Sequence, residues 1–162
     1  TKSFDEWKSG QKVGFLKALE DKFSAINIVS NWSYVANPTG GFMNLYWGGQ
    51  GDTNARQYLQ LEISNQNEIK LNIRLSTPSK EETSPIRRKC IKFYENSFKN
   101  NEFNFIQHIK KVDRLGSGRS VALVQITPKF EIDPTKPLNI DEMFSFLKEA
   151  TEFLAQNYWK VE

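Results

Sequence analysis

Two neighbouring segments with a period of two constrain this fold more than any other feature of the sequence. In residues 56–63 and 68–75, apolar side chains occupy alternate positions, as in strands that bury one face. A loop of odd length, residues 65–67, matches the two apolar faces when the segments pair as a hairpin. The predicted cross-strand pairs are Ile63–Ile69, Leu61–Leu71, Leu59–Ile73, Glu62–Lys70, Gln60–Asn72 and Tyr58–Arg74. A slip of one residue would misplace both faces, so the pattern predicts this register.

Helical periodicity predicts helices around these strands in residues 3–24, as one helix or two short ones, from Pro85 to about Phe98, and from Asn139 to about Tyr158. Ser84 before Pro85 is typical of a helix start, and residues 78–83 are expected to form a polar linker. Asn139, with Glu142 three residues later, is predicted to cap the last helix. Further strands are predicted at 42–47, 103–112 and 119–126. We therefore predict an α+β fold: a mostly antiparallel five-stranded sheet in the order α-β-β-β-α-β-β-α, with the helices packed on one face.

Length and composition fit one such domain over residues 1–162. The chain lacks an initiator Met, which favours a domain excised from a longer protein. No run of apolar residues approaches the length of a membrane span, and the first residues do not resemble a secretory signal. Cys90 is the single cysteine, so no intramolecular disulfide can form. We expect a cytoplasmic protein that does not contact membranes.

Few residues are available for catalysis or metal binding. His108 is the single histidine, which excludes the usual multi-histidine metal sites and weakens any Ser-His-Asp or Cys-His arrangement. Glu68-Ile69-Lys70 with Asp52 upstream matches the acidic-x-Lys pattern of metal-dependent nucleases. The same short pattern also occurs twice in the predicted first helix, and Glu62 is already expected opposite Lys70. We therefore predict no catalytic residues, no metal and no cofactor in this chain.

The charge balance permits contact with phosphate without requiring it. The net charge is +3, and the calculated isoelectric point is about 8.9. The candidate phosphate-binding residues are the arginines Arg56, Arg74, Arg87, Arg88, Arg114 and Arg119. The glycine-rich segments 48–51 and 116–118 are more typical of hairpin turns than of phosphate loops. The aromatic residues Phe42, Tyr46, Trp47 and Trp32 are candidates for stacking on bases, although core packing is the more common role of such residues.

Three segments together resemble part of a known family. They are Gly41-Phe42-Met43-Asn44-Leu45-Tyr46-Trp47, Tyr58-Leu59-Gln60-Leu61-Glu62 and Arg114-Leu115-Gly116-Ser117-Gly118-Arg119-Ser120-Val121-Ala122. This pattern resembles the C-terminal region of a bacterial and phage family in the PD-(D/E)XK nuclease superfamily, over roughly residues 11–128. The resemblance implies an accessory domain whose nuclease core would lie upstream. It transfers no catalytic residue to this chain.

Our functional hypothesis is a non-catalytic accessory domain that contacts nucleic acid or a protein partner. One alternative is a small-ligand module with an apolar cavity between a curved sheet and the C-terminal helix. Another is a homo-oligomerisation domain that docks through an exposed patch of Phe144, Phe146 and Phe153. The position of the arginines distinguishes these alternatives, because a shared basic face favours nucleic acid.

Overall fold

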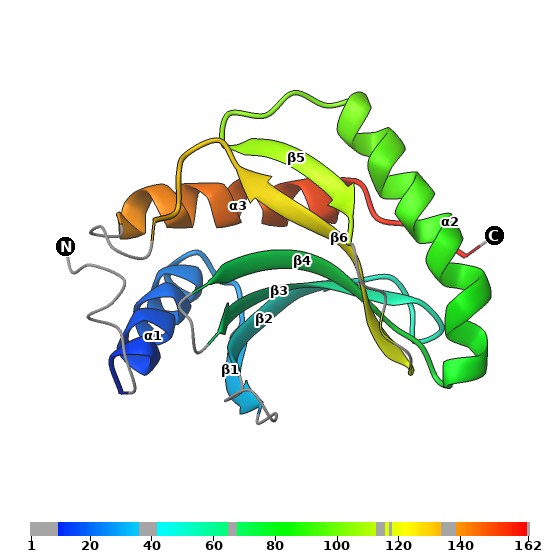
Figure 1. Cartoon of the computed structure of the whole chain (residues 1–162), viewed down its shortest axis with the longest axis horizontal. Coiled ribbons are helices and arrows are strands. Elements are labelled where there is room, and N and C mark those ends of the chain that lie inside the picture. Colours follow the sequence, from blue (N-terminus) through cyan, green and yellow to red (C-terminus); the bar gives the residue numbers. More distant parts are fainter. Residues whose placement is uncertain are drawn as a thin grey trace.

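Three helices and six strands make up the described part of the chain (Figure 1). The computed structural model describes residues 10–35, 42–64, 68–112, 116, 118–133 and 139–161. In chain order the elements are α1 (Gly10–Ala25), β1 (Ser30–Val35), β2 (Phe42–Gln50), β3 (Arg56–Ser64), β4 (Ile69–Ser76), α2 (Lys80–Lys99), β5 (Ile106–Lys111), β6 (Ser120–Pro128) and α3 (Ile140–Gln156). The predicted α+β class is confirmed.

The six strands form one antiparallel sheet in the order β1-β2-β3-β4-β6-β5. The β3–β4 hairpin has the predicted register throughout, including Ile63 opposite Ile69 and Glu62 opposite Lys70. Helix α2 connects β4 to the edge strand β5, and β6 then returns between them. The matched period-two patterns therefore determined the centre of the sheet correctly.

The structure adds a sixth strand and moves one helix start. The added strand, β1, is an edge strand that pairs with β2 alone, and its alternation of polar and aromatic residues gave little apolar signal. Helix α2 begins at Lys80 rather than at Pro85. The buried Thr83 hydroxyl donates to the Ser79 carbonyl at 3.3 Å and lies 2.7 Å from the Thr77 hydroxyl. These bonds organise an extra first turn, so Ser79 rather than Ser84 precedes the helix and residues 80–83 belong to it instead of to a linker. Pro85 lies inside the helix, in its second turn, where it supplies no N–H to the Glu81 carbonyl.

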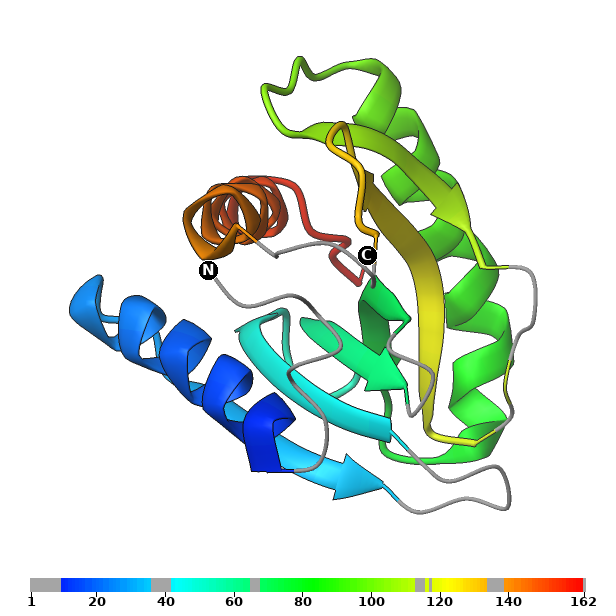
Figure 2. The same ribbon diagram turned by 60° about the vertical axis from the view of Figure 1, so that its left-hand side comes forward.

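One hydrophobic core joins the sheet to all three helices. Its strand contribution comes from alternate rows of the sheet, and its helix contribution includes Phe23 of α1, Tyr94 of α2 and Phe153 of α3. The Tyr94 and Phe153 rings lie 6.4 Å apart, which links α2 to α3. Figures 1 and 2 show the strands bowed along their length and α3 lying against the sheet between α1 and α2. The helices are thus packed against the sheet as predicted.

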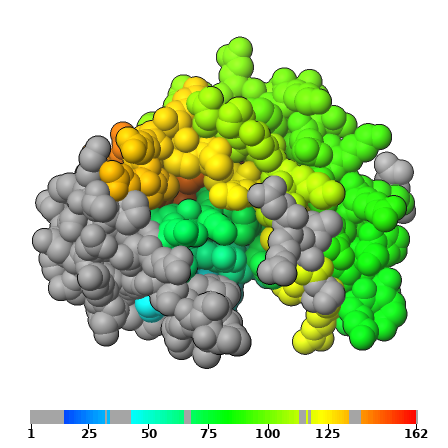
Figure 3. Space-filling model, viewed as in Figure 1, coloured from blue at the N-terminus to red at the C-terminus, as the bar shows by residue number. Residues whose placement is uncertain are grey.

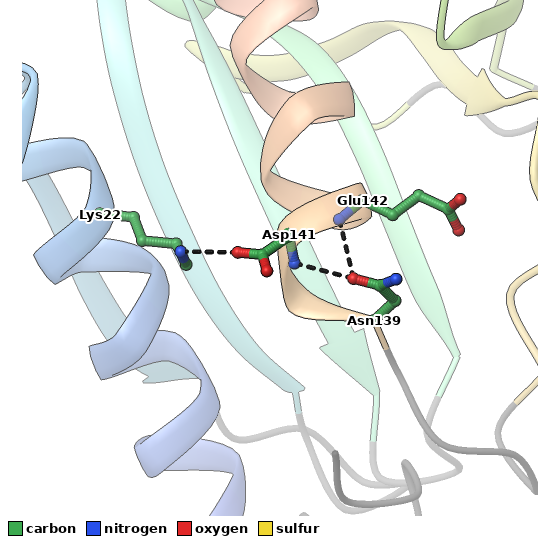
Figure 4. A network of polar contacts seen from close by, with 4 residues as sticks. All are labelled: Lys22, Asn139, Asp141 and Glu142. Atoms are coloured by element: carbon green, nitrogen blue, oxygen red, sulfur yellow. Dashed lines mark hydrogen bonds and ion pairs between the residues drawn. The ribbon is translucent and has the colours of Figure 1, made fainter.

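A polar contact fastens α1 to the start of α3 (Figure 4). The Asn139 side chain accepts from the backbone N–H groups of Asp141 and Glu142, both at 3.1 Å, as a helix cap. Lys22 donates to the Asp141 carboxylate at 2.9 Å. The predicted cap at Asn139 is confirmed. Because Asp141 is largely exposed, the ion pair contributes orientation more than stability.

A buried glutamine connects the start of β3 to the C-terminal segment. The Gln57 side-chain amide donates to the carbonyls of Ala55 and Trp159, at 2.8 and 2.9 Å. Its carbonyl oxygen accepts from the Trp159 N–H at 2.8 Å and from the Tyr94 hydroxyl. Burial raises the pKa of Tyr94, so its hydroxyl keeps the proton that it donates. Gln57 therefore satisfies polar groups from three separate parts of the chain.

Replacing Gln57 with alanine should lower the free energy of unfolding by about 2–3 kcal/mol, because buried donors and acceptors would lose their partners. Urea denaturation followed by circular dichroism measures this change. Gln156→Ala, at an exposed position of α3, is the matched control and should change stability by less than about 0.5 kcal/mol. Equal stabilities of the two variants would contradict the structural role of Gln57.

Cys90 offers a second test of the core. Its side chain is fully buried on α2, and desolvation raises the pKa of the thiol to about 12. Since the thiolate is the reactive form, a thiol reagent such as Ellman's reagent should react with the native protein only as fast as the protein opens. In denaturant, one thiol per chain should react within seconds to minutes. Rapid reaction of the native protein would show that Cys90 is not buried in the core.

Candidate functional site: the open face of the sheet

The rows of the sheet that alternate with the core rows are polar and form its open face. One row crosses all six strands: Asn31, Tyr46, Gln60, Asn72, Gln125 and Lys110. A neighbouring row contains Tyr58, Arg74 and Ala122. In Figure 1 no helix lies beneath the bowed strands β1 to β4, and in Figure 3 atoms of β3 and β4 (teal to green) are visible at the surface. The open face is therefore a concave, polar surface.

A hollow of about 560 Å³ lies on this face over β1, β2 and β3. Its volume is within the range of about 300–1,000 Å³ that is typical of small-molecule sites. The described residues that line it are Val29, Asn31, Ser33, Asn44, Tyr46, Trp47, Gly48, Gly49, Arg56, Tyr58, Gln60 and Ser76. Arg56 is the one charged residue among them. The hollow combines a single cation with two tyrosines and a polar floor.

Hydrogen bonds hold Tyr58 in place beside the hollow. Its hydroxyl accepts from Arg74 Nε at 3.3 Å and lies 2.8 Å from the Ser120 hydroxyl. The Arg74 guanidinium also donates to the Ser120 carbonyl at 3.2 Å. Tyr46 meets Tyr58 edge to face, with ring centroids 6.4 Å apart, and is 40% exposed. Tyr46 is thus an exposed ring supported by a fixed neighbour.

Arg56 begins β3, and a bulge in β2 places Gly48 and Gly49 opposite its neighbour Tyr58. The register of β2 against β3 shifts between Trp47 and Gln50, and Gly48 in this bulge has a φ of 71°, which favours glycine. The Arg56 guanidinium lies directly against Gly49. Among the described residues, no ion pair or hydrogen bond engages that guanidinium. Arg56 is therefore an exposed cation whose donors remain available.

The other candidate arginines do not join this surface. Arg87 on α2 donates to the Gly116 carbonyl at 2.9 Å, and Arg88 is exposed on the same helix. Arg119 is exposed just before β6, where its carbonyl accepts from the Thr77 N–H at 2.8 Å. Arg114 lies outside the described residues. The structure therefore brings Arg56 and Arg74 onto one face and leaves Arg87, Arg88 and Arg119 on other parts of the surface.

The pairing needed for a metal-dependent nuclease site is not assembled. Asp52 precedes β3, whereas Glu68 follows it, so the two carboxylates lie at opposite ends of a nine-residue strand. At about 3.3 Å per residue this separates them by about 25–30 Å. No group of three or more potential metal ligands occurs within the described ranges. One cation cannot bridge Asp52 and Glu68.

The features behind the two alternative functions are placed differently from what we expected. Phe146 and Phe153 are buried in the core, and the Phe144 ring packs edge to face on Phe23 at 5.2 Å. They do not form an exposed patch. Trp47 is also a core residue, since its Nε1 donates to Thr151 on α3 at 2.8 Å. Thr151 of α3 therefore packs directly onto the sheet at this point. The hollow lies on the opposite face of the sheet.

Sequence reasoning identified Tyr46, Arg56 and Arg74 but missed other parts of the site. The missed residues include Asn44, whose side chain accepts from Ser33 at 3.2 Å, and Gly49, which makes room for Arg56. The alternation in β2 could have placed Asn44 and Tyr46 on one face, because Met43, Leu45 and Trp47 are apolar. The bulge gave no comparable signal. The side chains of Trp32 and Phe42, also suggested for base stacking, lie outside the described part of the structure.

Comparison with known proteins identified no match among family models, curated proteins or solved structures. Within the described ranges, no helix combines the length and apolar character needed to cross a membrane. The assignment of a function therefore depends on the geometry of the open face.

Glu62 is an acidic residue on the open face, beside Lys70 and Arg74. Desolvation by burial raises the pKa of its carboxyl group, and the nearby charges of Arg74 and Lys70 partly oppose this effect. The Gln60 amide also donates to it at 3.2 Å. The folded state therefore retains the Glu62 proton to a higher pH than the unfolded chain does.

This difference predicts the pH dependence of a Glu62→Gln variant. Between the unfolded and the raised folded pKa, the folded state binds more protons, so Glu62 makes the wild type lose stability as pH rises through this window. The variant should lack this loss and should be more stable than wild type at pH 7, with a smaller difference at pH 3. Urea denaturation at both pH values measures it. The opposite result is a variant that is less stable than wild type at pH 7, by more than at pH 3. It would show that the attraction of Arg74 and Lys70 for the Glu62 carboxylate outweighs its desolvation.

Proposed function

We propose that this chain binds single-stranded nucleic acid across the open face of its sheet, as a non-catalytic accessory domain of a nuclease-like protein. The observation that supports this most strongly is the juxtaposition of Arg56 with Tyr46 and Tyr58 on a concave polar surface. Exposed aromatic rings stack on bases, and nearby cations bind the backbone of a strand. Paired bases in a duplex could not lie flat on these rings.

Side-chain amides on the same face are suited to hydrogen-bond the edges of bases. Asn44, Gln60 and Asn72 lie on adjacent strands, and each can donate and accept hydrogen bonds. Asn72 Oδ1 is buried without a hydrogen-bond partner in the described part of the structure. Amides beside tyrosines are suited to hydrogen bonding with unstacked bases, whose edges are exposed.

The family resemblance supports the same class of ligand. Residues 42–47 and 58–62, from two of its three segments, lie in β2 and β3, which line the hollow. An accessory domain that binds one strand would hold the substrate of a nuclease core located elsewhere. The modest net charge of +3 fits a small contact surface rather than an extensive basic groove.

Fluorescence anisotropy with labelled single-stranded DNA, single-stranded RNA and duplex DNA tests the proposal. We expect micromolar binding of a single strand at low salt, which weakens as salt rises because phosphate contacts release counterions. Replacing Tyr46 with alanine should weaken binding about 5-fold or more, since one stacking contact contributes about 1–3 kcal/mol. Replacing Arg56 with glutamine should reduce the salt slope by about 0.7.

Arg88→Gln is the matched control, because Arg88 is an exposed arginine on α2, away from the open face. It should bind like wild type. No binding of any probe at low salt would overturn the proposal and would favour a protein partner for this face. Equal losses in Arg56→Gln and Arg88→Gln would also contradict it, because binding would then reflect overall charge alone.

A further inference from the structure

Gly49 makes room for Arg56, the one charged residue among the described residues that line the hollow. A Cβ atom added at Gly49 would lie 2.3 Å from Nη2, 2.7 Å from Cζ and 2.8 Å from Nε of Arg56. Real Cβ atoms essentially never approach other atoms below 3.0 Å. Any side chain at position 49 would therefore displace the guanidinium. Since the displaced atoms are the far end of a flexible side chain, the backbone would not have to move.

The Arg56 guanidinium that packs on Gly49 has no acidic group beside it among the described residues that line the hollow. Arg74 differs, because its guanidinium already donates to Tyr58 and to the Ser120 carbonyl. A planar guanidinium with free N–H groups binds two oxygens of a phosphate side by side. Of the two arginines on the open face, Arg56 is the one suited to bind an anion.

An aromatic surface lies in the same hollow as this cation. Tyr46 is 40% exposed, and its ring is supported edge to face by Tyr58. The floor is polar, with Asn44 and Gln60 both largely buried. A ligand that matches all three features has a flat ring, polar ring edges and a phosphate.

We infer that the hollow is the seat of one nucleotide, with its phosphate on Arg56 and its base against Tyr46. This inference rests on the proposed function. It specifies where one nucleotide of the bound nucleic acid lies on the open face. Gly49 is a positioning residue in this arrangement, because its lack of a side chain leaves room for the Arg56 guanidinium. Arg74 keeps Tyr58 in place rather than binding phosphate.

Titration of the ¹⁵N-labelled protein with AMP, adenosine and inorganic phosphate, followed by NMR, tests the seat. AMP should shift the Gly49 amide and the Arg56 Nε–H signals and should bind at least tenfold more tightly than adenosine or inorganic phosphate. In Gly49→Ala the advantage of AMP over adenosine should fall to about threefold or less. Gly116→Ala is the matched control, because an added Cβ there meets no atom within 4 Å, and it should keep the full advantage.

The outcomes separate this inference from the proposed function. If labelled single strands bind but AMP and adenosine bind equally well, the phosphate seat is wrong and the proposed function stands. The same holds if Gly49→Ala retains the advantage of AMP while its spectrum remains that of a folded protein. If inorganic phosphate binds as tightly as AMP, Arg56 binds a simple anion and the base contact is wrong. If neither AMP nor any single strand binds, both proposals fail.

Discussion

The pairing of β3 with β4 is the constraint on which the rest of the structure depends. Its register assigns every side chain of the two central strands to one of two faces, because successive residues point in opposite directions. The apolar rows then bury against the helices, and the polar rows remain open. Strands β2 and β6 extend the same division outward on either side. The placement of Tyr46, Tyr58, Arg56 and Arg74 on one face follows from this assignment.

One face of the sheet is apolar because it packs against the helices, and the other is polar because it faces solvent. On the core side, Leu59, Leu61 and Ile73 are fully buried, and each contributes favourable burial of apolar surface. One polar residue on this side, Gln57, is tolerated because all of its hydrogen bonds have partners. On the open side, polar side chains contact one another and solvent. A site for a polar ligand can form there without disturbing the core.

Local irregularity, rather than regular strand geometry, creates the distinctive part of the site. The bulge in β2 places Gly48 in a left-handed conformation and sets Gly49 against Arg56. Two arginines on the same face thereby acquire different roles. Arg74 is engaged by Tyr58 and Ser120, whereas Arg56 faces the hollow with its donors available. Charge alone would not distinguish them, because both are arginines on neighbouring strands.

The sequence by itself determined the α+β class, the β3–β4 register and the cap at Asn139, because each depends on short-range periodicity or on a local hydrogen bond. Tertiary structure decided the remaining features. The edge strand β1 forms only because β2 offers it a partner, and α2 starts early because Thr83 contacts Thr77 across the preceding turn. The separation of Asp52 from Glu68, the burial of Phe146 and Phe153, and the seating of Arg56 on Gly49 also depend on how distant segments meet. Such contacts leave no periodic trace in the sequence, since they join residues through space rather than along the chain.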